Sequence, residues 1–209
     1  MTIDSSKAVP IIGIKRLCLN TDGQGITTLV GFHGCPLRCK YCLNPQSIGD
    51  MDRVIWMTPE DVIKELKKDY FYFLTTQGGV TFGGGEPFLK ADFIKEVLEM
   101  GVKQWHVTIE TSLNVPRENI MNLFPYIDEY IVDIKDTDKE IYRKYTSKSS
   151  ERVIENIKWL VSQGKADSII ARIPLIDKFN SPECQERSKA LLSSIGLSRF
   201  DLFTYITNN

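Results

Sequence analysis

Hydrophobic residues along the chain form short runs that alternate with longer segments of helical periodicity. Runs rich in β-branched and aromatic residues predict strands, whereas apolar residues that recur every three or four positions predict helices. We expect strands at residues 27–32, 79–82, 105–109, 129–135, 168–173 and 200–205. We expect helices at residues 58–73, 90–100, 116–124, 150–163 and 183–194. This alternation predicts an α/β fold with mostly parallel strands.

The number of repeated units limits the architecture. About six β–α units are too few for a closed eight-stranded barrel, so we expect an open, partial (β/α)6 barrel. The sequence has no repeat, no low-complexity segment and no linker rich in Pro, Gly or Ser. Residues 1–209 are therefore expected to form a single domain, with residues 1–24 as a lead-in strand and turn. Functional groups should gather at the carboxyl ends of the strands.

The helix expected at residues 58–73 has a recognisable start. Thr58 stands at the N-cap, Pro59 takes the first helical position, and Asp61 completes a capping-box-like pattern. These three residues predict where the helix begins.

Two of the expected strands carry polar residues on one face. In "WHVTIETS" (105–112) Thr108 and Glu110 share a face, and in "YIVDIKD" (130–136) Asp133 shares a face with Lys135. An unpaired charge inside a sheet is very costly. Either Asp133 and Lys135 neutralise each other, or these faces line a polar cavity.

Composition excludes several classes of protein. The 209 residues are 42% hydrophobic and 25% charged, with a net charge of −1, which is typical of an ordinary globular protein. Balanced charge argues against a nucleic-acid partner. No apolar run approaches the roughly twenty residues of a membrane span, and we see no signal peptide, so we expect no membrane partner and a cytoplasmic location. In that compartment we expect the five cysteines to be metal or catalytic ligands and not to form disulfides.

Three of the cysteines stand close together in "GCPLRCKYCLNP" (34–45), with the spacing Cys35-x3-Cys39-x2-Cys42. Three thiolates on one loop suit three irons of a [4Fe–4S] cluster and leave the fourth iron open to a small molecule. Two other interpretations are a zinc site completed by His33, and plain free thiols. The isolated Cys18 and Cys184 are expected to be ordinary thiols.

The same stretch carries a family resemblance. A Cys-x3-Cys-x-aromatic-Cys loop, with Tyr41 at the aromatic position, resembles the cluster motif of the radical S-adenosylmethionine superfamily. The longer stretch "TDGQGITTLVGFHGCPLRCKYCLNP" resembles the activating enzymes of glycyl-radical enzymes. It departs from them at Thr27, where the family commonly has Arg.

The resemblance extends to the cofactor site. By itself "GGVTFGGGEP" (78–87) suits a tight turn before a helix, but its GGE triplet resembles the family motif that binds the amino group of S-adenosylmethionine. A D-x-K strand and an acidic-Thr pair resemble the cofactor-carboxylate and monovalent-cation sites. The resemblance, with the strand-end positions, gives these cofactor-binding residues: Tyr41 (against the adenine), Gly84, Gly85, Glu86, Glu110, Thr111, Asp133, Lys135 and Arg172. Arg172 suits an outer salt bridge equally well. Beyond the cluster and cofactor no catalytic residue is expected, unless Lys135 or Arg172 acts as one.

The function implied is that of a radical S-adenosylmethionine oxidoreductase working anaerobically. It would cleave S-adenosylmethionine reductively to a 5′-deoxyadenosyl radical, which abstracts a hydrogen atom from a glycine of a partner glycyl-radical enzyme. Flavodoxin or ferredoxin is the expected electron donor. An enzyme acting on a small molecule, as in deazaguanine synthesis, or on a peptide is the alternative. A non-enzymatic zinc or iron–sulfur module would leave Glu86, Glu110, Asp133 and Lys135 without a purpose.

Overall fold

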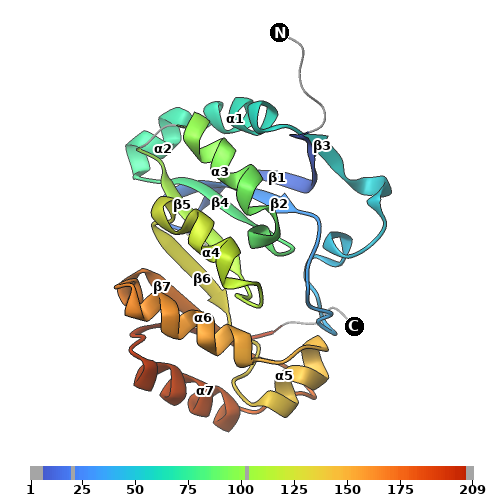
Figure 1. Ribbon diagram of the computed structural model, residues 1–209, viewed down its shortest axis with the longest axis vertical. Helices are drawn as coiled ribbons and strands as arrows, with labels where there is room; N and C mark the ends of the chain where they lie inside the picture. The colour runs from blue at the N-terminus through green and yellow to red at the C-terminus, as the bar shows by residue number, and fades with distance from the viewer. Residues whose placement is uncertain (1–6, 20–21, 102–103, 206–209) are drawn as a thin grey trace. The chain divides into compact units, whose positions relative to one another are not determined.

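The computed structural model describes residues 7–19, 22–101 and 104–205 (Figure 1). Its residues divide between two compact units. The first unit consists of residues 1–35, 44–111 and 116–129, and the second of residues 36–43, 112–115 and 130–209. The organisation of the whole chain as a single domain stays a prediction.

The strands of the first unit form a mixed sheet in the order β3-β1-β2-β4-β5. Strands β2, β4 and β5 are parallel, and β1 pairs antiparallel with β2 and β3. The strands are β1 (Val9–Leu19), β2 (Ile26–Phe32), β3 (Ile55–Met57), β4 (Gly79–Gly84) and β5 (His106–Thr111). Side chains with no exposed surface line the parallel strands, as expected for strands covered on both faces: Val30, Phe32, Val80, Phe82 and Ile109.

The helices of the first unit connect these strands. They are α1 (Pro59–Lys67), α2 (Tyr70–Thr76), α3 (Ala91–Met100) and α4 (Arg117–Leu123), with short 3₁₀ turns η2 (Pro45–Ser47), η3 (Met51–Arg53), η4 (Pro87–Lys90) and η5 (Phe124–Tyr126). Helix α3 packs against both α1 and α4 (Figure 1). The capping box at the start of α1 is confirmed, because Thr58 Oγ1 accepts from Asp61 N and Asp61 Oδ2 accepts from Thr58 N.

The prediction of one helix at residues 58–73 was wrong, because α1 ends at Lys67 and α2 begins at Tyr70. Asp69 lies between them and its side chain is fully buried. The carboxylate accepts from Arg16 Nε at 3.0 Å and from Thr28 Oγ1 at 2.6 Å. The chain breaks its helical path at Asp69 and carries this carboxylate to partners on β1 and β2.

The second unit is built on three parallel strands in the order β6-β7-β8. Its elements are β6 (Glu129–Asp133, in this unit from Tyr130), β7 (Ile169–Leu175), β8 (Arg199–Thr204), α5 (Lys139–Thr146), α6 (Glu151–Ser162), η6 (Ala166–Ser168) and α7 (Pro182–Ile195). Helix α5 was not predicted. Asp138 is its N-cap, and the carboxylate accepts from Glu140 N at 2.9 Å and from Ile141 N at 3.0 Å.

The α/β class with mostly parallel strands is confirmed. Both β3 and β8 pair on one side only among the described residues, so the strands do not close into a barrel. All six predicted strands exist, although β6 ends at Asp133, two residues earlier than expected. In the part of the chain that the structure describes, no helix is long and apolar enough to cross a membrane.

Candidate functional site

In the first unit, the GGE triplet lies beside the start of the cysteine stretch. Where β4 ends, Gly85 N donates to Phe32 O at 2.9 Å, and Glu86 N donates to Gly34 O at 2.8 Å. Gly34 N in turn donates to Ser47 O at 2.7 Å. Gly34 precedes Cys35, so backbone hydrogen bonds join the residue before the first motif cysteine to the GGE turn at the carboxyl ends of β2 and β4.

The two predicted glycine ligands have a structural reason to be glycines. Gly84 has φ +87°, and a Cβ there would lie 2.8 Å from Gly31 Cα. A Cβ on Gly85 would lie 2.2 Å from Gly34 O, closer than any side chain permits. The glycines therefore let the turn pack against β2 and the cysteine stretch. Their contact with a cofactor stays a prediction.

The carboxylate of Glu86 is almost completely buried, with 1% of the residue exposed. Its Oε1 accepts a hydrogen bond from Thr111 Oγ1 at 2.7 Å and a weaker one from Phe88 N at 3.4 Å. Thr111 ends β5, and Glu110 before it is half-buried with its carboxylate near Gly83. The structure thus brings together Glu86 and Thr111, which the sequence placed in one cofactor site.

Asn44 is a positioning residue to which sequence reasoning gave no role. Its Nδ2 donates to Gly84 O at 3.1 Å, so it fixes the "NP" end of the cysteine stretch to the GGE strand. The signal was present, because Asn44 belongs to the quoted motif. Its partner lies 40 positions away, which no local pattern reveals.

The other two motif cysteines, Cys39 and Cys42, lie in the second unit. Burial raises the pKa of the Cys39 thiol to about 11, Lys135 opposes this shift, and the nearby Cys42 adds to it. Two neighbouring thiols suit an iron–sulfur cluster, whose ligands are thiolates; at Cys39 the charge of Lys135 favours the thiolate and burial disfavours it.

Residues 36–43, which we call the cysteine loop, are fixed to α5 and to the residue that follows β8. Tyr41 O accepts hydrogen bonds from Tyr145 Oη at 3.2 Å and from Tyr205 Oη at 2.5 Å. Burial raises the pKa of both phenols, so both stay protonated and can donate. The Tyr41 ring lies edge-to-face with Phe179, with centroids 5.7 Å apart. The contact of Tyr41 with adenine is untested, whereas the hydrogen bond places Tyr205 as a support of the loop.

Lys135 and Asp133 form an ion pair, which was one of the two alternatives that the sequence left open. Lys135 Nζ lies 2.9 Å from Asp133 Oδ2, and the lysine side chain is only 11% exposed. Burial acts to lower the pKa of Lys135, but the charges of Asp133 and Cys39 outweigh it and raise the pKa. An ammonium group has three N–H donors, so this pair leaves Lys135 chemically able to bind an anion as well.

Arg172 makes the salt bridge that the sequence allowed. It lies beside Asp133 in the parallel ladder, and its Nε is 3.6 Å from Asp201 Oδ2 on β8. A contact between Arg172 and a cofactor stays a prediction.

The remaining candidates have local partners. His33 Nε2 lies 3.0 Å from Gly49 O. Cys18 and Cys184 are buried thiols; Cys18 contacts Lys15 O, and Cys184 contacts the side chains of Ser181 and Arg187. Among the described residues, no three His, Cys, Asp or Glu side chains are arranged to hold a metal ion. The assignment of the cysteines as cluster ligands therefore stays a prediction from their spacing.

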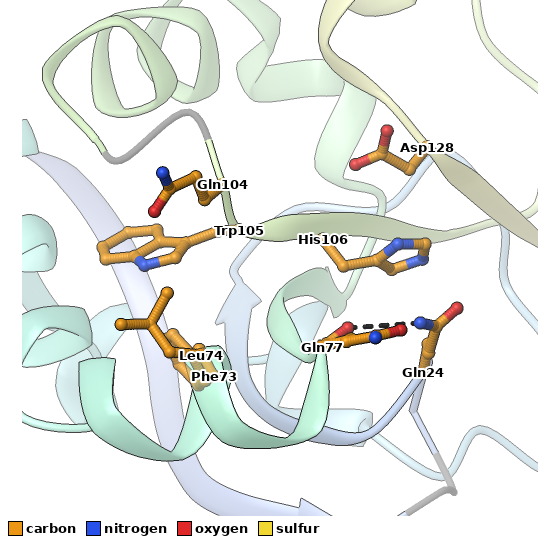
Figure 2. A pocket seen from close by; sticks show the side chains of 8 residues that line it. All are labelled: Gln24, Phe73, Leu74, Gln77, Gln104, Trp105, His106 and Asp128. Atoms are coloured by element: carbon orange, nitrogen blue, oxygen red, sulfur yellow. Dashed lines mark hydrogen bonds between the residues drawn. The ribbon is translucent and has the colours of Figure 1, made fainter.

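A pocket of about 420 Å³ opens at the other end of the first unit's parallel strands (Figure 2). The ring of His106 lies between Asp128 and Gln24, while the Trp105 indole faces Leu74 (Figure 2). Trp105 and His106 stand where β5 begins. The predicted Glu86 and Thr111 stand at the carboxyl ends, where parallel α/β sheets place their active sites.

Known proteins resemble this chain over most of its length. The family model described as "Radical SAM superfamily" matches residues 29–187. The chain is 28% identical to the (2S)-3-sulfopropanediol dehydratase activating enzyme of Klebsiella oxytoca, over 89% of this chain and 78% of that protein. It is 31% identical to the pyruvate formate-lyase 2-activating enzyme of Escherichia coli, over 93% of this chain and 76% of that protein.

Solved structures are similar in fold. The crystal structure of Streptococcus suis SuiB bound to S-adenosylmethionine superposes with a TM-score of 0.61 at 18% identity. The match covers 87% of this chain and 41% of SuiB. At this identity the likeness concerns the fold alone.

Proposed function

The chain belongs to the radical S-adenosylmethionine superfamily, and we propose that it activates a partner glycyl-radical enzyme by abstracting a hydrogen atom from a glycine of that partner. Its cofactors are a [4Fe–4S] cluster and S-adenosylmethionine. The observation that carries the proposal is the 31% identity to an activating enzyme across three quarters of that enzyme's length. Several relatives of the chain are named as activating enzymes.

Cys35, Cys39 and Cys42 would hold the cluster and leave its fourth iron open to the cofactor. When bound, the cluster supplies one electron for the cleavage of S-adenosylmethionine to methionine and a 5′-deoxyadenosyl radical. The protein's part is to bind, orient and exclude water, because the cofactor carries the difficult chemistry.

The ammonium group of S-adenosylmethionine would bind to Glu86. Thr111 holds the Glu86 carboxylate from one side, so the acceptor keeps its direction before the cofactor arrives. The backbone of Gly84 and Gly85 would lie along the methionine part of the cofactor. A buried carboxylate is suited to a cationic ligand, because hydrogen bonds between oppositely charged groups are short and strong.

The carboxylate of the cofactor methionine would bind to Lys135. In this proposal Asp133 keeps Lys135 protonated. Asp133 and Glu110 would also bind ribose hydroxyls or a monovalent cation, Tyr41 would contact the adenine, and Arg172 would support the cofactor from β7.

The glycine substrate, the electron donor and the compartment belong to the same proposal. A flavodoxin or ferredoxin would reduce the cluster, and the reducing cytoplasm would keep the motif cysteines available for iron. The relatives favour the activase over an enzyme acting on a small molecule or a peptide. The family assignment likewise disfavours a non-enzymatic metal module.

Two anaerobic experiments test the proposal. Protein reconstituted with iron and sulfide, given dithionite and S-adenosylmethionine, should form 5′-deoxyadenosine. Incubation with a candidate glycyl-radical enzyme should then produce the glycyl doublet in the electron paramagnetic resonance spectrum. Tightly bound zinc without 5′-deoxyadenosine would overturn the radical chemistry. Cofactor cleavage without a doublet from any candidate partner would favour the small-molecule or peptide alternative.

A further inference from the structure

Exposed cations gather around the cysteine loop of the second unit. We call them the cationic face: Arg38, Lys40, Arg143, Lys144 and Lys148, all of them exposed. Arg38 and Lys40 flank Cys39 on the loop, and the other three lie in the last turn of α5 or just after it.

Backbone hydrogen bonds hold the two groups of cations together. Arg38 N donates to Thr146 O at 2.9 Å, and Lys40 N donates to Tyr145 O at 3.1 Å. Lys148 follows Thr146 by two residues. The cationic face therefore surrounds the point where the cysteine loop meets the end of α5.

Helix electrostatics explains only part of this face. Arg143 and Lys144 complement the negative end of the α5 macrodipole. Arg38, Lys40 and Lys148 lie outside the helix, and backbone N–H groups of the loop already bind two of its terminal carbonyls. The helix by itself does not account for these three cations.

Acidic residues near α5 lie mostly toward its other end. Asp138 caps the first turn, and Glu140 lies within it. Glu151 is paired with Lys139 at 2.5 Å, although Arg143 also lies close enough to help lower the pKa of Glu151. The charges of the helix are thus separated along its length, with the positive end at the cysteine loop.

The second unit as a whole also carries a net positive charge. Residues 36–43, 112–115 and 130–209 contain 15 Lys and Arg against 11 Asp and Glu, whereas the rest of the chain contains 11 against 16. Although the whole chain has a net charge of −1, the unit that carries two of the motif cysteines is basic.

We propose that the cationic face docks an acidic one-electron carrier protein, which reduces the cluster held by the same loop. The inference rests on the cluster assignment made above. One electron passes from the reduced flavin or iron–sulfur centre of the carrier to the oxidised cluster, the carrier is oxidised by one electron, and no bond forms or breaks. A carrier docked there lies over the residues that flank Cys39, which shortens the path of the electron. Opposite charges also steer the two proteins together.

The test compares two charge-matched double variants of the reconstituted enzyme. Lys144→Gln/Lys148→Gln removes two charges from the cationic face, and Lys158→Gln/Lys189→Gln removes two from α6 and α7. Calorimetric titration with an acidic flavodoxin and, separately, with an acidic ferredoxin measures binding. At low ionic strength we expect the first variant to bind at least one of these carriers about tenfold more weakly. Electrostatic steering raises association rates by about tenfold or more, and the variant loses part of it. The control should bind as wild type does, and 0.5 M salt should remove the difference.

Stopped-flow reduction of the cluster gives a second readout. Reduction by the carrier should slow by a similar factor, whereas reduction by photoreduced deazaflavin, an uncharged reductant, should be unchanged in both variants. Equal effects of the two double variants would overturn the proposal, because net charge alone would then explain them. Weaker binding of the glycyl-radical enzyme with unchanged binding of both carriers would also overturn it. Failure of the activase assignment can be distinguished from failure of the docking proposal. In that case no glycyl radical forms, but carrier binding still depends on Lys144 and Lys148.

Discussion

Thr111 donates its hydroxyl hydrogen to the carboxylate of Glu86 across 2.7 Å, within a buried part of the first unit. The two residues are 25 positions apart and come from the carboxyl ends of neighbouring strands. The bond helps to fix the direction of the carboxylate to which we assign the ammonium group of S-adenosylmethionine.

Replacing Thr111 by Val should therefore weaken the binding of S-adenosylmethionine. A hydrogen bond to a charged group contributes about 1.5–3 kcal/mol, which corresponds to roughly tenfold to hundredfold in the dissociation constant. Isothermal titration of the reconstituted enzyme measures the effect. Thr111→Ser keeps the hydroxyl and should restore most of the affinity. Wild-type affinity in Thr111→Val would show that Glu86 needs no orienting donor.

Lys135 should matter for the same cofactor through the carboxylate of its methionine part. In Lys135→Gln the positive charge is lost, and we expect S-adenosylmethionine to bind about a hundredfold more weakly, since a charge-assisted bond in a buried site is worth up to about 3 kcal/mol. Lys135→Arg keeps the charge and should lose about tenfold or less, because its geometry differs. Equal losses in the two variants would indicate a packing role for Lys135 instead.

Asp69 should make stability depend on pH. Burial acts to raise the pKa of Asp69, but the hydrogen bonds from Arg16 and Thr28 prevail and hold the pKa below its ordinary value. A lowered folded pKa gives stability that is complete above the unfolded pKa of about 3.9 and is lost as the pH falls through the folded value.

We therefore expect Asp69→Asn to lower the free energy of unfolding by about 2 kcal/mol at pH 7, somewhat less than a fully buried pair, because Arg16 is partly exposed. The difference from wild type should shrink as the pH falls below 4. Urea titrations at pH 7 and pH 3 measure it, with the exposed Asp52→Asn as control. A difference of the same size at both pH values would contradict the ion-pair explanation.

The two tyrosines that bind Tyr41 O should act cooperatively. Tyr145→Phe or Tyr205→Phe alone leaves one donor on the carbonyl and should cost about 1 kcal/mol. The double variant leaves a partly buried carbonyl without either phenol, so its cost should exceed the sum of the single ones by about 1 kcal/mol. A double-mutant cycle from urea titrations of the cluster-free protein measures this. Simple additivity would mean that water replaces the lost hydroxyls.

Gly85 should tolerate no side chain. In Gly85→Ala the new Cβ would meet Gly34 O at 2.2 Å, so the turn must move, and we expect a loss of about 3 kcal/mol or more, within the range of overpacked sites. Gly13→Ala is the matched control, because nothing lies within 4 Å of its added Cβ. Thermal unfolding of both variants compares them. Similar melting temperatures would show that the GGE turn relaxes easily.

Local signals in the sequence predicted the parts of the fold that local forces determine. The capping box of Thr58 and Asp61 spans four residues, and apolar runs mark the buried strands. The break at Asp69 depends on Arg16 and Thr28, which lie 53 and 41 positions away. Helix α5 is short, and its few apolar positions did not stand out from its charged ones.

The candidate site likewise has features that the sequence predicted and features that it could not predict. The cysteine spacing and the GGE triplet could be identified by resemblance, because they are contiguous motifs. The role of Thr111 as a hydrogen-bond donor to Glu86, and that of Asn44 as a donor to Gly84 O, depend on strand neighbours far apart in the sequence. Resemblance also could not reveal that Gly85 is excluded from carrying a side chain by Gly34 O.

The hydrogen bond from Tyr205 to Tyr41 spans 164 positions and has a consequence for biosynthesis. A chain leaves the ribosome from its N-terminus at about 5–20 residues per second, so residues 36–43 emerge long before residue 205. During that interval the loop lacks one of the two phenols that hold its carbonyl, and Cys39 and Cys42 are presented on an incompletely folded segment. On the cluster assignment proposed above, we expect iron loading into the native loop to be a late step, after Tyr205 has reached Tyr41 O. Until then the nascent cysteines depend on the reducing power of their surroundings for protection.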